Sequence, residues 1–124
     1  MIILDIDHFK NVNDEFGHNT GDMVLQEFAS ILLRNCRETD IIGRWGGEEF
    51  LIVAPNTKKE SLSYFANNLK EAAESHQFEN IGNLTASLGV TVYHVKEPLN
   101  NTIARADEAL YISKNSGRNQ VTLK

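Results

Sequence analysis

The sequence predicts an α+β domain built on a mostly antiparallel sheet, close to a ferredoxin-like arrangement. Short segments rich in β-forming residues alternate with longer segments whose apolar residues recur every three or four positions. Two of the short segments flank a Gly-Gly pair, which predicts a β-hairpin. The predicted element order is β-α-β-β-α-β-α-β, with the helices packed on one side of the sheet.

Length and composition fit one domain. The 124 residues are 41% hydrophobic and 23% charged, which is ordinary for a globular protein with a core. The net charge of −5 argues against a nucleic-acid groove, and an acidic protein that handles phosphates needs a metal to bridge its carboxylates to them. Cys36 is the only cysteine, which excludes a disulfide framework and favours a reducing, cytoplasmic setting. We expect no membrane contact by this segment, which lacks an apolar window of membrane-spanning length.

The first strand is predicted at residues 1–6, which are apolar except for Asp5. Asp5 and Asp7 share a face because side chains alternate along a strand. Residues 11–20 are polar and contain glycine, which predicts a loop. This loop is expected to end at a helix with Thr20 as its cap and Asp22 in its first turn. The apolar face of that helix comprises Leu25, Phe28, Ala29, Leu32 and Cys36.

Two more helices and two more strands are predicted downstream. Residues 57–60, Thr-Lys-Lys-Glu, have the pattern of a capping box and open the second helix. The third helix runs from Thr102 to Ser116, with Gly117 as its C-terminal stop. Residues 84–95 are rich in β-formers, and residues 121–123 form a short last strand. The buried positions are Leu62, Phe65, Ala66, Leu69 and Ala73 in the second helix, and Ala86, Leu88, Val90 and Val92 in the strand.

The hairpin comprises residues 40–45 and 48–54 around Gly46 and Gly47. A two-residue primed turn needs positive φ at both central positions, which glycine adopts without strain. Glu48 and Glu49 open the second strand and are expected to point to opposite faces, so that only one belongs to a given site. By itself, such a pattern also describes a solvated hairpin tip.

Two spaced motifs together resemble the GGDEF family of diguanylate cyclases. One is Asp5-Ile6-Asp7-His8-Phe9-Lys10-Asn11-Val12-Asn13-Asp14, and the other is Gly46-Gly47-Glu48-Glu49-Phe50. The resemblance extends to Gly117-Arg118-Asn119. It implies a palm-type sheet with the hairpin at its rim. The implied activity is the condensation of two GTP molecules to cyclic di-GMP and two pyrophosphates by a homodimer in which each subunit binds one GTP.

The resemblance implies a metal site at the two motifs. Asp5, Glu48 and the backbone carbonyl of Ile6 are expected to bind Mg²⁺, with Mn²⁺ as a substitute, because these cations prefer hard oxygen ligands. Glu48 is also expected to help remove the hydroxyl proton. Supporting roles fall to Asp7, Gly46, Gly47 and Glu49. The alternative is that Asp5 caps a loop and that Glu48 is solvated.

The resemblance also implies nucleotide contacts. Asn13 and Asp22 match guanine-reading positions, where an amide donates to O6 or N7 and a carboxylate accepts from N1 and N2. Lys10, Lys114 and Arg118 match phosphate contacts. Lys114 and Arg118 have the four-residue spacing of one helical face, and Arg118 lies just beyond the predicted stop at Gly117. The alternatives are an ordinary turn residue for Asn13 and helix-dipole interactions for the charged residues at helix ends.

Residues 37–40, Arg-Glu-Thr-Asp, match the Arg-x-x-Asp motif at which this family binds its product as an inhibitor. Arg37 can hold a phosphate or guanine edge with two hydrogen bonds, and Asp40 can accept from guanine. The alternative is a helix-to-strand connection that carries opposite charges.

Other functions are compatible with the same fold. A non-catalytic module that binds GTP or cyclic di-GMP is one alternative, although the hairpin is intact, and another palm-type nucleotidyl transferase is a second. Family domains carry a helix and an Asp-x-Leu-Thr-Gly-Leu-x-Asn-Arg-Arg turn before the first strand, whereas Met1 directly precedes Ile2 here. We therefore expect residues 1–124 to be a single catalytic domain without that helix, following a sensory domain in the parent protein. Alone it is expected to be poorly active and to associate through uncovered apolar surface.

Overall fold

The computed structural model describes residues 1–124 and contains four α-helices and seven β-strands. The helices are α1 (Phe9–Phe16), α2 (His18–Asn35), α3 (Lys59–Ser75) and α4 (Leu99–Asn115). The main sheet contains β1 (Ile2–Ile6), β2 (Ile41–Arg44), β3 (Glu49–Val53), β6 (Ala86–Val90) and β7 (Val121–Leu123), and a second sheet contains β4 (Gln77–Phe78) and β5 (Gly82–Asn83).

The main sheet has the strand order β2-β3-β1-β6-β7. Its neighbouring strands are antiparallel except for β6 and β7, which are parallel. The predicted α+β class with a mostly antiparallel sheet is therefore confirmed, as is the hairpin formed by β2 and β3. The small β4–β5 pair was not predicted, because two-residue strands carry no periodic signal.

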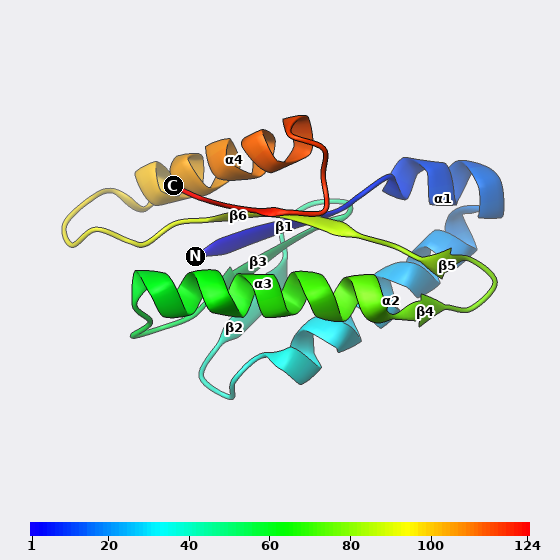
Figure 1. Ribbon diagram of the computed structural model, residues 1–124, viewed down its shortest axis with the longest axis horizontal. Helices are drawn as coiled ribbons and strands as arrows, with labels where there is room; N and C mark the ends of the chain where they lie inside the picture. The colour runs from blue at the N-terminus through cyan, green and yellow to red at the C-terminus, as the bar shows by residue number, and fades with distance from the viewer.

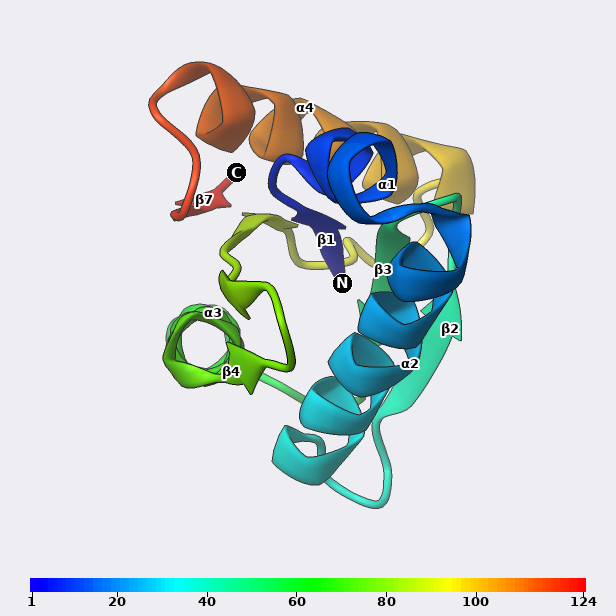
Figure 2. The same cartoon turned by 90° about the vertical axis from the view of Figure 1, so that its right-hand side faces the viewer.

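Helices cover both faces of the sheet. Figures 1 and 2 show α4 on one face and α2 with α3 on the other. The prediction that all helices pack on one side is wrong. Every residue of β1 and β6 is buried, as expected for strands with both faces covered. None of the helices combines the length and the apolar composition that a membrane crossing requires.

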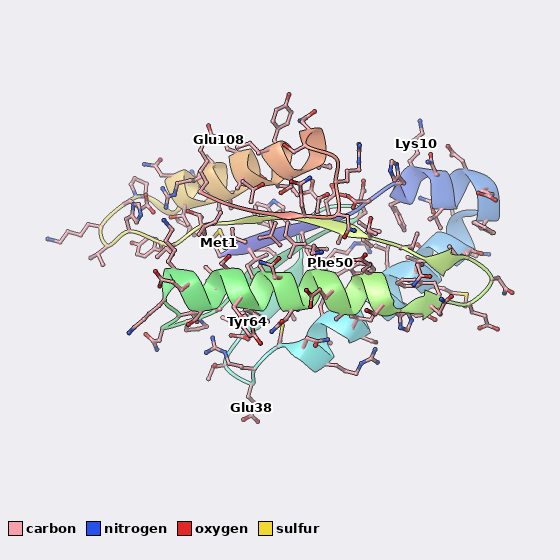
Figure 3. The ribbon with its side chains drawn as sticks, in the orientation of Figure 1. Met1, Lys10, Glu38, Phe50, Tyr64 and Glu108 are labelled. Atoms are coloured by element: carbon pink, nitrogen blue, oxygen red, sulfur yellow. The ribbon has the colours of Figure 1, made fainter.

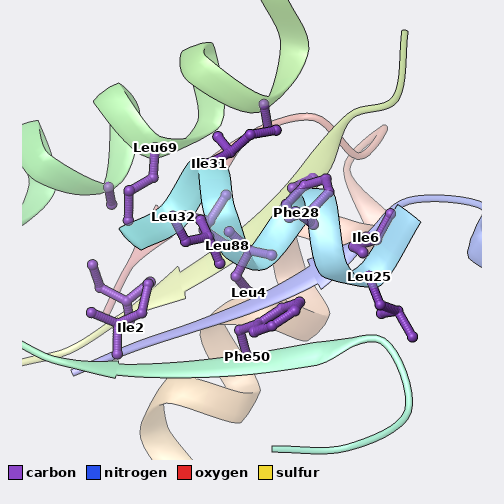
Figure 4. Close-up of a cluster of buried hydrophobic side chains, with 14 of the residues drawn as sticks. Ile2, Leu4, Ile6, Leu25, Phe28, Ile31, Leu32, Phe50, Leu69 and Leu88 are labelled. Carbon is purple, nitrogen blue, oxygen red and sulfur yellow. The ribbon is translucent and has the colours of Figure 1, made fainter. Parts of the chain in front are cut away.

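The larger core lies between the sheet and the α2–α3 layer, where Leu4 and Phe50 face α2 (Figure 4). The Phe28 ring of α2 stacks on Phe50 at a centroid distance of 6.3 Å and on Phe78 of β4 at 5.9 Å. Such aromatic stacks add to the free energy gained by burying the rings. The predicted apolar face of this helix is confirmed at Phe28, Leu25 and Leu32.

The second core joins α4 to the opposite face of the sheet through Ile3, Ala106 and Leu110. A Cβ atom on Gly89 of β6 would overlap the backbone of Ala106 and Leu110, so α4 lies directly against the strand. The Oγ of Ser113 donates a 2.8 Å hydrogen bond to the carbonyl of Leu88. These contacts fix the end of α4 that carries Lys114.

The predicted loop at residues 11–20 is wrong, because most of this segment belongs to α1 and the start of α2. Phe9 and Val12 are the buried anchors of α1, and two apolar residues are too few to show a helical period. Gly17, with φ of 89°, separates the two helices and is the N-cap of α2. Thr20 is therefore not a cap, and Asp22 lies in the second turn.

The ends of α3 and α4 test two further predictions. The capping box at residues 57–60 does not form: Lys58 is the N-cap of α3, and the Thr57 hydroxyl donates to the Pro55 carbonyl instead. The stop at Gly117 is confirmed. Gly117 has φ of 110°, and the N–H of Arg118 donates to the Ser113 carbonyl at 3.0 Å, which is the bond of a Schellman motif.

Candidate active site

Asp5 lies at the end of β1 and is 3% exposed. The Nζ of Lys114, in the last turn of α4, donates to its Oδ2 at 2.6 Å. The two residues are 109 positions apart, so the pair forms only when α4 packs on the sheet. Sequence reasoning placed both residues in the site but did not foresee that they bind each other.

The strand register brings Glu49 to Asp5, and Glu48 lies immediately before the same strand. Glu49 is the direct antiparallel partner of Asp5, so the two side chains leave the sheet on the same face. Glu48 precedes β3, and its carbonyl accepts the N–H of Ile6 at 3.2 Å. The negative charge of Glu48 acts on both Asp5 and Glu49. Strand alternation therefore does not separate the two carboxylates, because Glu48 lies before the strand begins.

The hairpin tip differs from the predicted primed turn. Neither Gly46 nor Gly47 has positive φ. The N–H of Trp45 donates to the Glu49 carbonyl at 2.8 Å, so the connection is longer than two residues. The guanidinium of Arg44 donates to the Gly46 carbonyl at 3.1 Å and to the Gly47 carbonyl at 2.7 Å. Arg44, to which the sequence assigned no role, thus fixes the shape of the tip.

Burial and the neighbouring negative charges disfavour the charged forms of Asp5 and Glu49. Burial raises the pKa of Asp5, and the hydrogen bond from Lys114 opposes this rise while the charges of Glu48 and Asp7 add to it. Burial also raises the pKa of Glu49, and the charge of Asp5 is the next cause. Each group would be stabilised in its charged form by an added cation.

These oxygen donors fit a Mg²⁺ ion that binds together with a phosphate-bearing ligand. No three His, Cys, Asp or Glu side chains form a complete metal-binding group. Mg²⁺ does not need one, because it is usually held by one or two carboxylates, with water and substrate phosphates completing its octahedron. Asp5 and Glu48 can supply the carboxylates, and the Glu48 carbonyl keeps the backbone of Ile6 beside the hairpin tip.

Asp7 is a buried anchor for three neighbouring groups. It is 3% exposed. Its Oδ2 accepts from the Thr85 hydroxyl at 2.7 Å and from the Asn119 N–H at 3.0 Å, and its Oδ1 accepts from the Ser87 hydroxyl at 2.7 Å. Thr85 and Ser87 were missed, although hydroxyls two residues apart in a predicted strand share a face and are a recognisable signal.

The residues after α4 carry Arg118. Gly117, Arg118 and Asn119 all have left-handed φ values, of 110°, 62° and 47°. Arg118 therefore does not lie on the helical face of Lys114, which the four-residue spacing had predicted. Left-handed non-glycine residues are costly, and here the Asn119 N–H bond to Asp7 holds them in place. The loop that carries Arg118 is in this way fastened to the end of β1.

The predicted guanine residues lie on α1 and α2. The Asn13 side chain packs over Gly21, where a Cβ atom would overlap its Oδ1. Asp22 is exposed and lines an open groove of about 560 Å³ whose wall includes Arg44 and Phe50. Lys10 points outward from α1 (Figure 3) and forms no ion pair.

The Arg-x-x-Asp motif lies apart from these residues, at the opposite end of β2 from Gly46. The Nη2 of Arg37 is 3.0 Å from Asp40 Oδ1 and donates to the Thr57 hydroxyl at 2.7 Å. The Asp40 side chain is fully buried. Glu38 extends into solvent from the same connection (Figure 3). The structure thus pairs the two motif residues with each other, and Thr57 is a third member that the sequence did not indicate.

A family model described as "Diguanylate cyclase, GGDEF domain" matches residues 1–120. The chain belongs to this family. It is 40% identical over 127 residues to diguanylate cyclase A of Treponema denticola, covering 99% of this chain and 34% of that protein. The GGDEF domain of DgcB from Caulobacter crescentus, solved in complex with c-di-GMP, superposes with a TM-score of 0.93 and 35% identity, covering 98% of this chain and 75% of that one.

The active GGEEF domain of a diguanylate cyclase from Vibrio cholerae superposes with a TM-score of 0.91 and 35% identity, covering 98% of this chain and 80% of that one. The GGEEF hairpin of this chain is Gly46–Phe50. The family resemblance and the palm-type fold are therefore confirmed. The chain spans only about a third of the length of the Treponema relative, at 34%.

Proposed function

We propose that this domain condenses two GTP molecules to cyclic di-GMP and two pyrophosphates, as a diguanylate cyclase. The observation that carries the proposal is the convergence of Asp5, Glu48, Glu49 and Lys114 at the hairpin tip. The family membership and the active GGEEF domain from Vibrio cholerae support it. Carboxylates facing a lysine suit chemistry in which phosphates are neutralised and aligned rather than attacked by a protein nucleophile.

A Mg²⁺ ion held by Asp5, Glu48 and the Ile6 carbonyl would neutralise phosphate charge and increase the acidity of the attacking 3′-hydroxyl. The protein residues then orient the nucleotide. Lys10, Lys114 and Arg118 bind its phosphates. Asp22, which lines the groove beside α2, and Asn13, on the neighbouring α1, hold guanine. Glu48 accepts the hydroxyl proton. Glu49 adds negative charge beside Asp5, and Asp7 fastens the Arg118 loop.

The reaction needs two nucleotides facing each other, and the chain offers one guanine groove with one carboxylate cluster. The active species is accordingly a homodimer in which each subunit holds one GTP. Cyclic di-GMP acts as product and, at Arg37 and Asp40, as inhibitor. A sensory domain in the parent protein and a cytoplasmic location complete the proposal.

The test is incubation of the protein with GTP and Mg²⁺ and chromatography of the products. Glu48→Gln and Asp5→Asn should each lower turnover by about a hundredfold or more, which is typical for losing one charge contact of a transition state. Glu71→Gln, an exposed change of the same kind on α3, should leave turnover unchanged. Circular dichroism must show the same fold for all variants. Near-normal turnover in Glu48→Gln or Asp5→Asn would refute the site assignment. Binding of GTP by the wild type without any turnover would instead indicate a non-catalytic module.

A further inference from the structure

Asp5, one of the two carboxylates proposed to bind the metal, is already paired with the ammonium of Lys114. The Nζ of Lys114 lies 2.6 Å from Asp5 Oδ2, and the Asp5 side chain is 4% exposed. Mg²⁺ binds a carboxylate oxygen at about 2.0–2.1 Å. The ammonium and the metal would therefore contend for the same buried carboxylate.

We propose that Lys114 is the counter-cation of the metal-free site: it competes with the divalent metal for Asp5, and metal binding releases its ammonium toward the phosphates of the nucleotide. This inference rests on the proposed function, which supplies the metal and the phosphates. It assigns two successive partners to Lys114, first Asp5 and then phosphate.

The two partners differ in their freedom to move. Asp5 is fixed in the central strand, with β3 on one side and β6 on the other. Lys114 carries a flexible four-carbon stem on the last turn of α4, and its side chain is 35% exposed. The neighbouring Ser113 holds the helix backbone to β6 and β7, so the ammonium can swing while its Cα stays in place.

The charges around Asp5 favour replacement of the Lys114 ammonium by the metal when nucleotide is bound. Without the lysine, Asp5 would be buried beside Glu48, Glu49 and Asp7 with no positive partner. A divalent ion brings more charge to this cluster than the ammonium does, and the nucleotide phosphates offer the released ammonium a new anionic partner. Metal and nucleotide should consequently bind with positive coupling, which is reciprocal by thermodynamic linkage.

The experiment measures binding of Mn²⁺ alone, without nucleotide, by titration calorimetry and electron paramagnetic resonance. Lys114→Met should bind Mn²⁺ about tenfold more tightly than wild type, equivalent to about 1.4 kcal/mol of binding free energy, because the competing positive charge is gone. Lys124→Met is the matched control. It removes the same charge from a surface pair with Glu108 that is also 2.6 Å long, at the opposite end of the sheet, and should leave Mn²⁺ affinity unchanged.

With Mg²⁺ present, Lys114→Met should bind a non-hydrolysable GTP analogue more weakly than wild type, the opposite sign to its effect on Mn²⁺. Equal or weaker Mn²⁺ binding by Lys114→Met would overturn the inference. If that variant does not fold, the wild type decides: Mg²⁺ titration should shift the side-chain NMR signals of Lys114 but not those of Lys124, and unmoved Lys114 signals would overturn it. A protein that passes these metal tests yet makes no cyclic di-GMP would contradict the proposed function alone.

Discussion

Replacing Asp7 by alanine tests how the site is held together. The change leaves the Thr85 hydroxyl, the Ser87 hydroxyl and the Asn119 N–H without their common acceptor. An unsatisfied buried donor costs about 1–3 kcal/mol, which applies in full to the buried Ser87 hydroxyl. The bonds of Thr85 and Asn119 are only partly buried, so that water can replace part of what these two donors lose. The costs of groups that share a partner are not additive, and we expect a total loss of about 2–4 kcal/mol. This is a large fraction of the about 5–15 kcal/mol that stabilises a typical domain.

Asparagine at position 7 should be much better tolerated. Its amide oxygen can replace Oδ2 as the acceptor for Thr85 and Asn119, and its amide nitrogen can donate to the Ser87 oxygen. Only the charge is then lost, for about 1–2 kcal/mol, the difference between charged and neutral hydrogen bonds. Urea unfolding followed by circular dichroism measures both variants. Our reasoning fails if Asp7→Ala lies within about 1 kcal/mol of wild type, the scale of a single ordinary hydrogen bond, or if Asp7→Asn costs as much as Asp7→Ala.

Three further predictions concern other parts of the molecule. Gly89→Ala should lower the free energy of unfolding by about 1–3 kcal/mol or more, because the added methyl group overpacks against α4. Gly43→Ala is the control, since the space around its Cβ position is open. In the same urea experiment it should change the free energy of unfolding by no more than about 0.5 kcal/mol. Because the pKa of Glu49 is raised, the folded protein keeps the proton of this carboxyl at a higher pH than the unfolded chain does. The contribution of Glu49 to the free energy of unfolding therefore falls as pH rises from the usual glutamate pKa to the raised one. Glu49→Gln should therefore gain stability relative to wild type as pH rises through that window, and a constant difference in melting temperature between pH 4 and 7 would contradict this. Arg37→Ala should weaken the affinity for cyclic di-GMP measured by titration calorimetry. Arg34 is exposed and forms no ion pair, so Arg34→Ala should leave that affinity unchanged. Equal affinity in the two variants would refute the inhibitory site.

The parts of the fold that sequence could predict are those whose local pattern and tertiary environment agree. The uninterrupted apolar run of β1 and the three-and-four spacing around Phe28 each describe a buried surface directly. The stop at Gly117 was predictable because only glycine enters the left-handed region freely. At the hairpin tip the prediction failed because a side-chain contact that the glycine pattern does not encode decided the conformation. The hairpin tip is shaped by the Arg44 guanidinium and not by the glycines alone.

The candidate site, like the fold, was predictable only in part. Its residue types were predictable from two motifs, but their mutual geometry was not. The pairing of Asp5 with Glu49 depends on strand register, and its pairing with Lys114 depends on α4 covering the face that the sequence had assigned to no helix. A one-residue change of register would send Glu49 to the other face, a distinction that no local motif contains.

The position of α4 links the stability of the fold to the chemistry of the site. Asp5 is buried at an energetic cost, which the Lys114 ammonium offsets. The adjacent Ser113 is bonded to β6, which holds the end of α4 that carries Lys114, and Gly89 leaves room for α4 to lie against β6. An alanine at position 89 would therefore act in two ways, by overpacking the second core and by moving the ammonium away from a buried carboxylate. Gly89 lies in an interior strand, far in sequence from either motif, and it supports the pair of Lys114 with Asp5 by allowing α4 to lie close to the sheet.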